Sequence, residues 1–170
     1  MHAAVQLPKK TMVDLTFGTQ KGENDFGQVL DTRAVKGAYV LLIRLSEDRD
    51  IGIGALGTVS FPAGFYAYTG SSMVNLEKRV ERHFREEKKM KWHIDHFLRE
   101  AEAVRAVLFP SHEREECEIN RMVFDMDDGM VVIQGFGSSD CSCETHLAYF
   151  GRDQPHFEYP QERQTMHPPS

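Results

Sequence analysis

The stretch YAYTGSSMVNLEKRVERHF, residues 66–84, changes its pattern of side chains halfway along. Its first part is aromatic and ends at a glycine, which is typical of a strand that runs into a turn. In its second part Asn75 is a fair helix N-cap, and four side chains then share one helical face: Leu76, Val80, His83 and Phe84. The stretch therefore predicts a strand, a glycine turn and a helix.

The rest of the chain predicts further short strands and helices. Apolar or glycine-punctuated runs favour strands at residues 38–45, 51–70, 104–110, 130–137 and 142–151. Helical spacing of apolar side chains favours helices at residues 92–101 and 112–126, the second capped by Ser111. We expect an α/β (α+β) fold in which helices flank a small, mainly antiparallel sheet.

With 170 residues, the chain is long enough for one sizeable core. We expect a single domain at residues 33–152, an N-terminal tail or irregular lead-in at residues 1–32, and a disordered C-terminal tail at residues 153–170. No apolar run approaches the roughly 18 residues of a membrane span, and the first residues lack the apolar core of a signal peptide. A cytoplasmic protein without a membrane partner is expected.

Charge is distributed unevenly along the chain. The net charge is −6, yet residues 75–99 hold eight Lys or Arg against five acids, so this segment is +3 and the remainder −9. Such a segment is typical of a surface that binds phosphate backbones, but a solvated helix with internal ion pairs explains it equally well. Arg79 and His83 are four residues apart, which places both on one helix face where they suit a phosphate group.

Three motifs follow one another along the chain: GAY at residues 37–39, YTG at residues 68–70 and SSMVNLEKRVERHF at residues 71–84. In this order they resemble the two tyrosine motifs and the stretch with the arginine and histidine of the GIY-YIG nuclease superfamily, within it the Uri-type endonuclease branch. The boxes FPAGFYAYTGSS, KWHIDHFL and GFGSSDCSCETHLAYF are similar to the Uri-type branch specifically. Residues 40–67 separate the two tyrosine motifs by more than the usual short hairpin, which leaves room for extra strand.

The resemblance implies a metal-dependent endonuclease that hydrolyses phosphodiester bonds in DNA. Tyr39 would activate or orient water, Tyr68 would complete the phosphate site, Arg79 would stabilise charge on phosphorus, and His83 would assist. We expect the substrate to be bound by Gly70, Ser71, Arg82, Lys88, Lys89 and His93. A partner protein or a homodimer would extend this DNA-binding surface.

The metal ligand of such a site is expected on the helix at residues 112–126. The resemblance implies one glutamate there, and Glu116 lies at the edge of the apolar stripe centred near Ile119, with Glu118 as the reserve choice. A single carboxylate suits Mg²⁺, or Mn²⁺ in its place, because such ions keep several waters and take further ligands from the substrate.

The chain has three cysteines, all in its second half. Together with one histidine, these cysteines would be the four ligands of a Cys₃His zinc site if their strands converge. The four residues are Cys117, Cys141, Cys143 and His146. Buried reduced thiols are the default expectation, because Cys-x-Cys is tighter than the usual zinc spacing. Two other functions stay open: a nucleic-acid-binding or accessory module that keeps the nuclease fold with little cleavage, and a thiol or zinc structural module.

Overall fold

The structure is a computed structural model that describes residues 13–16 and 36–155. It contains a six-stranded sheet in which every pair of neighbours is antiparallel. The strands lie in the order β1 (Val13–Thr16), β6 (Glu102–Pro110), β2 (Gly37–Leu45), β5 (Gly64–Ser72), β8 (Leu147–Tyr149) and β7 (Met130–Val131). The expected antiparallel α+β fold is confirmed.

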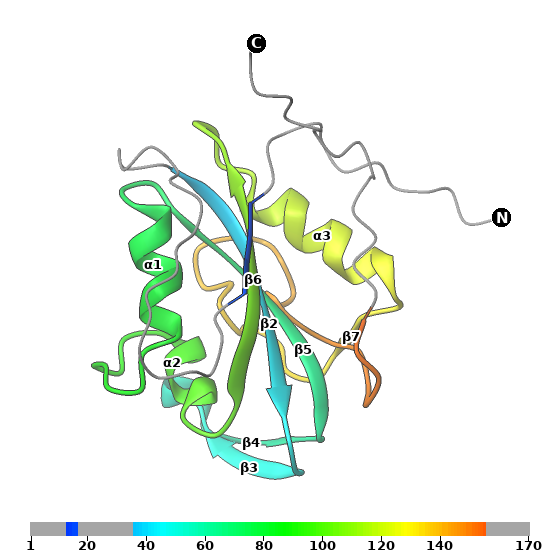
Figure 1. Cartoon of the computed structure of the whole chain (residues 1–170). Coiled ribbons are helices and arrows are strands. Elements are labelled where there is room, and N and C mark those ends of the chain that lie inside the picture. Colours follow the sequence, from blue (N-terminus) through cyan, green and yellow to red (C-terminus); the bar gives the residue numbers. More distant parts are fainter. Residues whose placement is uncertain (1–12, 17–35, 156–170) are drawn as a thin grey trace, which may run out of the picture.

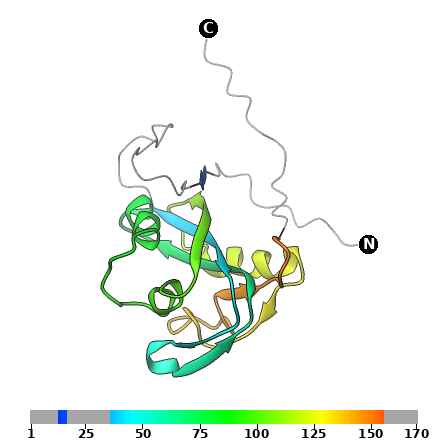
Figure 2. The same ribbon diagram turned by 60° about the horizontal axis from the view of Figure 1, so that its bottom comes forward.

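A second, two-stranded sheet lies between the two central strands in sequence. It consists of β3 (Arg49–Gly52) and β4 (Thr58–Phe61), joined through the short 3₁₀ helix η1 (Gly54–Leu56). Figure 2 shows this hairpin, in cyan, at the bottom of the molecule. The extra strand expected between the two tyrosine motifs is therefore present as a hairpin of its own.

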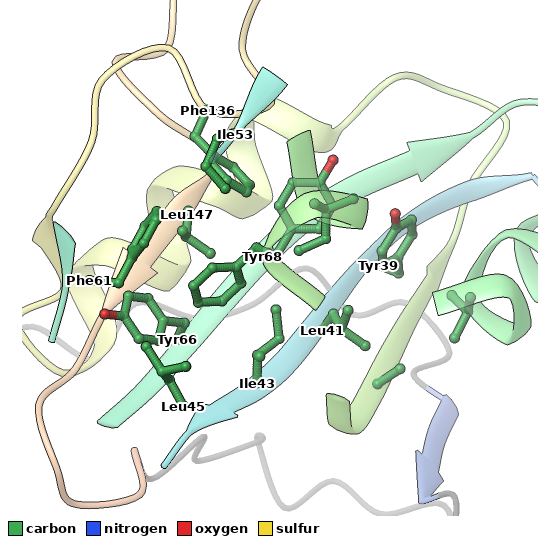
Figure 3. Packing of buried hydrophobic residues seen from close by; sticks show 14 of the residues in the cluster. Tyr39, Leu41, Ile43, Leu45, Ile53, Phe61, Tyr66, Tyr68, Phe136 and Leu147 are labelled. Carbon is green, nitrogen blue, oxygen red and sulfur yellow. The ribbon is translucent and has the colours of Figure 1, made fainter. Parts of the chain in front are cut away.

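Helices cover both faces of the large sheet. The helices α1 (Leu76–His83) and α2 (His93–Leu98) lie on one side, and α3 (Glu116–Met126) lies on the other (Figure 1). Because both faces are covered, β2 is apolar at almost every position rather than at every second one. Tyr39, Leu41 and Ile43 point to the core under α1 and α2 (Figure 3), while Ala38 and Val40 point to the core under α3.

The helix α1 follows its sequence pattern closely. Asn75 is the N-cap and its side chain accepts a hydrogen bond from the Lys78 N–H, which satisfies one of the free donors of the first turn. The expected inward positions Leu76, Val80 and His83 are all buried. The strand and the helix predicted within residues 66–84 are confirmed, but the expected turn at Gly70 is wrong, because β5 continues through Gly70 to Ser72 and the chain bends only at residues 73–74.

Several expected boundaries are wrong. The helix α3 begins at Glu116 rather than at residue 112, and Ser111 does not cap it: its hydroxyl accepts from the Glu113 N–H in a local turn. Such a short-range side-chain bond competes with helix formation. The helix α2 is shorter than the expected 92–101. Of residues 130–137 only Met130–Val131 form a strand, and of residues 142–151 only Leu147–Tyr149 do.

The two expected tails are described only in part. Within residues 1–32, Val13–Thr16 form β1, which pairs with β6 at the edge of the sheet. The other residues of that tail, and residues 156–170 of the C-terminal tail, lie outside the described residues. Among the described residues, no helix has both the length and the apolar composition that crossing a membrane requires.

Candidate active site

Two of the predicted site residues form a buried hydrogen bond between the sheet and α1. The Tyr39 hydroxyl on β2 lies 2.5 Å from Nε2 of His83, the last residue of α1. The Tyr68 ring on β5 packs against both, with its centroid 6.2 Å from each of theirs. Tyr39, Tyr68 and His83 form what we call the tyrosine–histidine cluster (Tyr39 and Tyr68 are labelled in Figure 3).

Burial keeps this cluster uncharged. Desolvation raises the pKa of Tyr39 well above its ordinary value, and the opposing effect of the Arg79 charge is too small to cancel it. Burial likewise raises the pKa of Tyr68. Burial, followed by the charge of Lys88, lowers the pKa of His83 to about 3. At neutral pH all three side chains are therefore neutral, and one of the two His83 ring nitrogens carries a lone pair.

Two glycines leave room for the tyrosine rings. Gly70 stands opposite Tyr39 in the β2–β5 register, and a Cβ on it would collide with the Tyr39 hydroxyl. Gly137 has a φ of 68°, and a Cβ on it would come within 2.9 Å of the Tyr68 ring. Gly70, predicted to bind substrate, is buried and serves as a spacer beneath Tyr39.

Glu116 lies in a second cluster at the start of α3. One of its oxygens accepts a 2.6 Å hydrogen bond from the Ser71 hydroxyl, and the other lies 3.0 Å from Nδ1 of His146. Burial alone would raise the pKa of Glu116, but the bonds from His146 and Ser71 outweigh it, so the pKa falls below its ordinary value. Glu118 is exposed on the outer side of the helix, and the arrangement favours Glu116 as the functional carboxylate.

The three cysteines converge beside Glu116. The ligand atoms of Cys117, Cys141, Cys143 and His146 all lie within 4.8 Å of one another. Cys141 Sγ is 3.4 Å from Nε2 of His146, and all three thiols are free of disulfides. We call Glu116, His146 and these three cysteines the carboxylate–thiol cluster.

Arg79 on α1 is close enough to both clusters for its charge to act on Tyr39 in one and on Glu116 in the other. Its guanidinium stacks on the Trp92 ring at 4.1 Å from the centroid, and Nη1 donates to the Ser71 carbonyl at 3.4 Å. The Arg82 guanidinium and the Lys91 ammonium also lie over the Trp92 ring. Trp92 is not among the predicted site residues, although a tryptophan next to a run of Lys and Arg residues indicates a cation–π contact.

Arg82 and Lys88, predicted to bind substrate, are engaged inside the protein. Arg82 forms a two-pronged ion pair with buried Asp95 at 2.7 and 2.9 Å and also donates to the Lys89 carbonyl. Lys88 Nζ donates to the His83 carbonyl at 3.0 Å. These contacts favour roles in holding α1 and α2 together.

Lys89 and His93 are nearer to solvent. Lys89 is exposed. His93, half-buried at the start of α2, accepts from the Gly137 N–H at 3.1 Å. His93 therefore fixes the Gly137 loop, which packs against Tyr68.

The two clusters are electrostatically connected across β5. The Glu116 charge contributes to the raised pKa of both Tyr39 and Tyr68. Residues 68–71 of β5 connect the clusters. Tyr68 belongs to the tyrosine–histidine cluster. On the other side, the Ser71 hydroxyl donates to Glu116, and the Thr69 carbonyl lies 3.1 Å from Nδ1 of His146. The result is one site with a neutral half and an ionised half.

These features define a small antiparallel α+β domain with a tyrosine, histidine, arginine and glutamate constellation beside a thiol cluster. The chain belongs to the family described as Domain of unknown function DUF123, whose model matches residues 38–166. No curated protein and no solved structure matches the chain.

Proposed function

We propose that the protein is a metal-dependent endonuclease that hydrolyses phosphodiester bonds in DNA, of the GIY-YIG type and its Uri-type branch. The support is the order of the motifs in the sequence together with one observation from the structure. Around residues 68–71 of β5, Arg79, Glu116 and the bonded pair Tyr39 and His83 are gathered from three different elements, α1, α3 and β2. Cation, carboxylate and proton acceptor are the groups that phosphodiester hydrolysis needs.

Arg79 is the residue proposed to bind the phosphate. Its guanidinium keeps its charge at any working pH and matches a phosphate with two parallel N–H donors. Stacking on Trp92 fixes the plane of the guanidinium without neutralising it. Arg79 therefore stabilises the negative charge that builds on phosphorus during the reaction.

Glu116 is the residue proposed to hold a divalent cation, Mg²⁺ or Mn²⁺. It fits this role because its carboxylate has a lowered pKa and its side chain is 28% exposed. A carboxylate has about four lone-pair sites, so the bonds to Ser71 and His146 leave acceptor positions for a hard cation. When bound, such an ion lowers the pKa of water and stabilises the leaving oxygen.

Tyr39 and His83 are proposed to move the proton of the attacking water. Because its pKa is raised, Tyr39 is not a phenolate before the reaction begins. The neutral phenol can accept a proton from water only if it donates its own proton to another group at the same time. His83 is the proposed acceptor of that proton, because its Nε2 lies within hydrogen-bond distance of the Tyr39 hydroxyl. The pair is therefore proposed to work as a relay, in which His83 assists Tyr39 as the resemblance implies.

One observation favours the alternative of a nucleic-acid-binding or accessory module. Tyr39 is only 1% exposed and Tyr68 only 8%, so water reaches the relay only if bound DNA opens the site. The same basic surface binds DNA in either case, and salt-sensitive binding without cleavage is the result that distinguishes this module from an enzyme.

The test is a cleavage assay with the full chain on labelled duplex, single-stranded, flap and junction DNAs, in Mg²⁺ and in Mn²⁺. Arg79→Ala and Glu116→Gln should each reduce the cleavage rate about 100- to 1,000-fold. Arg85→Ala and Glu118→Gln are the matched controls, because both residues are exposed and lie on the same two helices or their ends. Both controls should cleave at the wild-type rate.

Equal losses in Arg85→Ala and Arg79→Ala would remove Arg79 from the mechanism and point to general charge attraction. Wild-type protein that binds DNA but cuts none of the substrates in either metal would exclude the enzyme and leave the binding module. Thermal unfolding of every variant separates loss of chemistry from loss of fold.

A further inference from the structure

We propose that Cys117, Cys141, Cys143 and His146 bind one zinc ion as a closed structural site. This inference is independent of the proposed nuclease function. It concerns a different metal with different ligands from the hard cation proposed at Glu116. Three thiolates and an imidazole are the soft and borderline donors that zinc prefers over Mg²⁺.

The distances fit a tetrahedral zinc ion. With Zn–S bonds of about 2.3 Å and a Zn–N bond of about 2.0 Å, two sulfurs lie about 3.8 Å apart and a sulfur and a nitrogen about 3.5 Å apart. Cys141 Sγ and His146 Nε2 are separated by 3.4 Å, and the whole set falls within 4.8 Å. A contraction of about 1 Å at the widest pair closes the site, which side-chain rotation supplies.

The four ligands come from separate places that the fold brings together. Cys117 is the second residue of α3, Cys141 and Cys143 lie in the loop after β7, and His146 directly precedes β8. Backbone bonds fix the loop in this position: Gly135 N–H donates to the Glu144 carbonyl at 2.7 Å, and His146 N–H donates to the Phe136 carbonyl at 2.8 Å. The ligand set is thus preorganised by the backbone.

The orientation of His146 is that of a metal ligand. Its Nε2 faces Cys141, while Nδ1 is within hydrogen-bond distance of the Glu116 carboxylate. A proton on Nδ1 donated to the carboxylate leaves the Nε2 lone pair free for a metal, the arrangement in which a second carboxylate orients a metal-binding histidine. Glu116 is therefore a positioning residue for the zinc site as well as the proposed ligand of the hard cation.

A plain apolar role for the thiols fits less well. The cysteines are half-buried rather than fully buried, and their neighbours include the buried polar side chain of His146. The chain has only three cysteines, and all three meet beside one histidine. None of the three cysteines belongs to the two core clusters, and zinc would link α3 to the loop before β8.

The test measures metal binding directly and needs no cleavage assay. The full chain is purified without chelator and its zinc content is measured; the metal is then removed under reducing conditions and Co²⁺ is titrated in as an optical probe. We expect one zinc per chain, and thiolate-to-cobalt charge-transfer bands together with the intense visible bands of tetrahedral Co²⁺. Zinc should also protect all three thiols from a thiol reagent.

Variants assign the ligands. Cys143→Ser and His146→Gln should weaken Co²⁺ binding at least about 100-fold, and Glu116→Gln about 10- to 100-fold through the orientation of His146. Ser142→Ala and His112→Gln, both at exposed positions, are the matched controls and should bind as the wild type does.

Wild-type protein without zinc, without tetrahedral Co²⁺ bands and with three thiols equally reactive in zinc and in chelator would overturn the proposal, whatever the variants do. That result would leave the nuclease proposal untouched, since cleavage is measured separately. Conversely, a protein with bound zinc and no cleavage would retain this site and lose the nuclease.

Discussion

Two buried histidines, one in each cluster, have opposite pKa shifts. His83 is 3% exposed and faces the Tyr39 phenol, and its pKa falls to about 3. His146 is 1% exposed and faces the Glu116 carboxylate, and its pKa is raised. Burial lowers the pKa of both, so the partner decides the outcome: a neutral phenol leaves desolvation unopposed, and a carboxylate more than offsets it.

The difference teaches how one small sheet supports two kinds of chemistry. The tyrosine–histidine cluster is packed in the aromatic core, where neutral groups can pass protons but hold no ions. The carboxylate–thiol cluster lies at the start of α3, where the Glu116 carboxylate meets the side chains proposed to bind zinc. Only residues 68–71 of β5 separate these two environments.

The largest expected effect is a loss of cleavage rate on substitution in the tyrosine–histidine cluster. Tyr39→Phe and His83→Gln should each reduce the DNA cleavage rate about 100-fold or more, the usual loss on removing a proton-transfer group, with DNA affinity unchanged. The double variant should be no worse than the poorer single one, because the two residues act as one relay.

Tyr66→Phe is the matched control for that experiment. Tyr66 is a buried phenol on the same strand β5 as Tyr68, and its hydroxyl donates to the Pro62 carbonyl, away from His83. It should keep full activity. If Tyr39→Phe cleaves as fast as Tyr66→Phe, the relay does not exist and the tyrosine only fills the core.

A smaller effect concerns the space that Gly70 leaves for the Tyr39 ring. Gly70→Ala should lower the free energy of unfolding by about 2 kcal/mol, because its Cβ would collide with the Tyr39 hydroxyl inside a packed core. Gly52→Ala is the control, since a Cβ on Gly52 of β3 meets nothing within 4 Å. Urea unfolding monitored by circular dichroism measures both. Equal stability of the two variants would show that the Tyr39 ring moves aside without cost.

The smallest effect is the pH dependence that His83 imposes on stability. Its folded pKa of about 3 lies below the ordinary value of 6.5, so between these values only the unfolded chain takes up the proton. The stability linked to neutral His83 is complete above about pH 6.5 and is lost as the pH falls, by about 1.4 kcal/mol at pH 5.5.

Urea unfolding at pH 7 and pH 5.5 measures this loss as the difference between wild type and His83→Gln. His112→Gln is the control, because His112 is exposed and should leave the wild-type pH dependence intact. A His83→Gln variant that loses as much stability as the wild type between these pH values would mean that His83 is protonated in the folded protein.

The fold could be predicted from the sequence where short-range chemistry decides it. Residues 66–84 contain their own strand, N-cap and apolar helix face, and the structure has each of them. The start of α3 was misplaced because Ser111 bonds the Glu113 N–H locally, a competition that apolar spacing does not reveal.

The candidate site was only partly predictable for the same reason. The sequence predicts Tyr39, His83 and Glu116 as site residues, and the structure has them in the two clusters. It does not predict that Arg82 forms an ion pair with Asp95, thirteen residues away. The tight Cys-x-Cys spacing makes buried reduced thiols the default expectation, and no spacing rule shows that Cys117 meets residues 141–146. These are long-range contacts, and only the packing of α3 and the last loop against β5 creates them.

The most direct test of the account is the protonation state of His83 in the full chain. Long-range ¹H–¹⁵N correlation spectra of the histidine rings, recorded from pH 7 to pH 5 and assigned with His83→Gln, give it without any assay of activity. The account predicts ring nitrogen shifts of a neutral His83 that stay constant over this range. A His83 ring that titrates with a midpoint near its ordinary value of 6.5 would contradict it, since the relay partner of Tyr39 would then be charged rather than able to accept a proton.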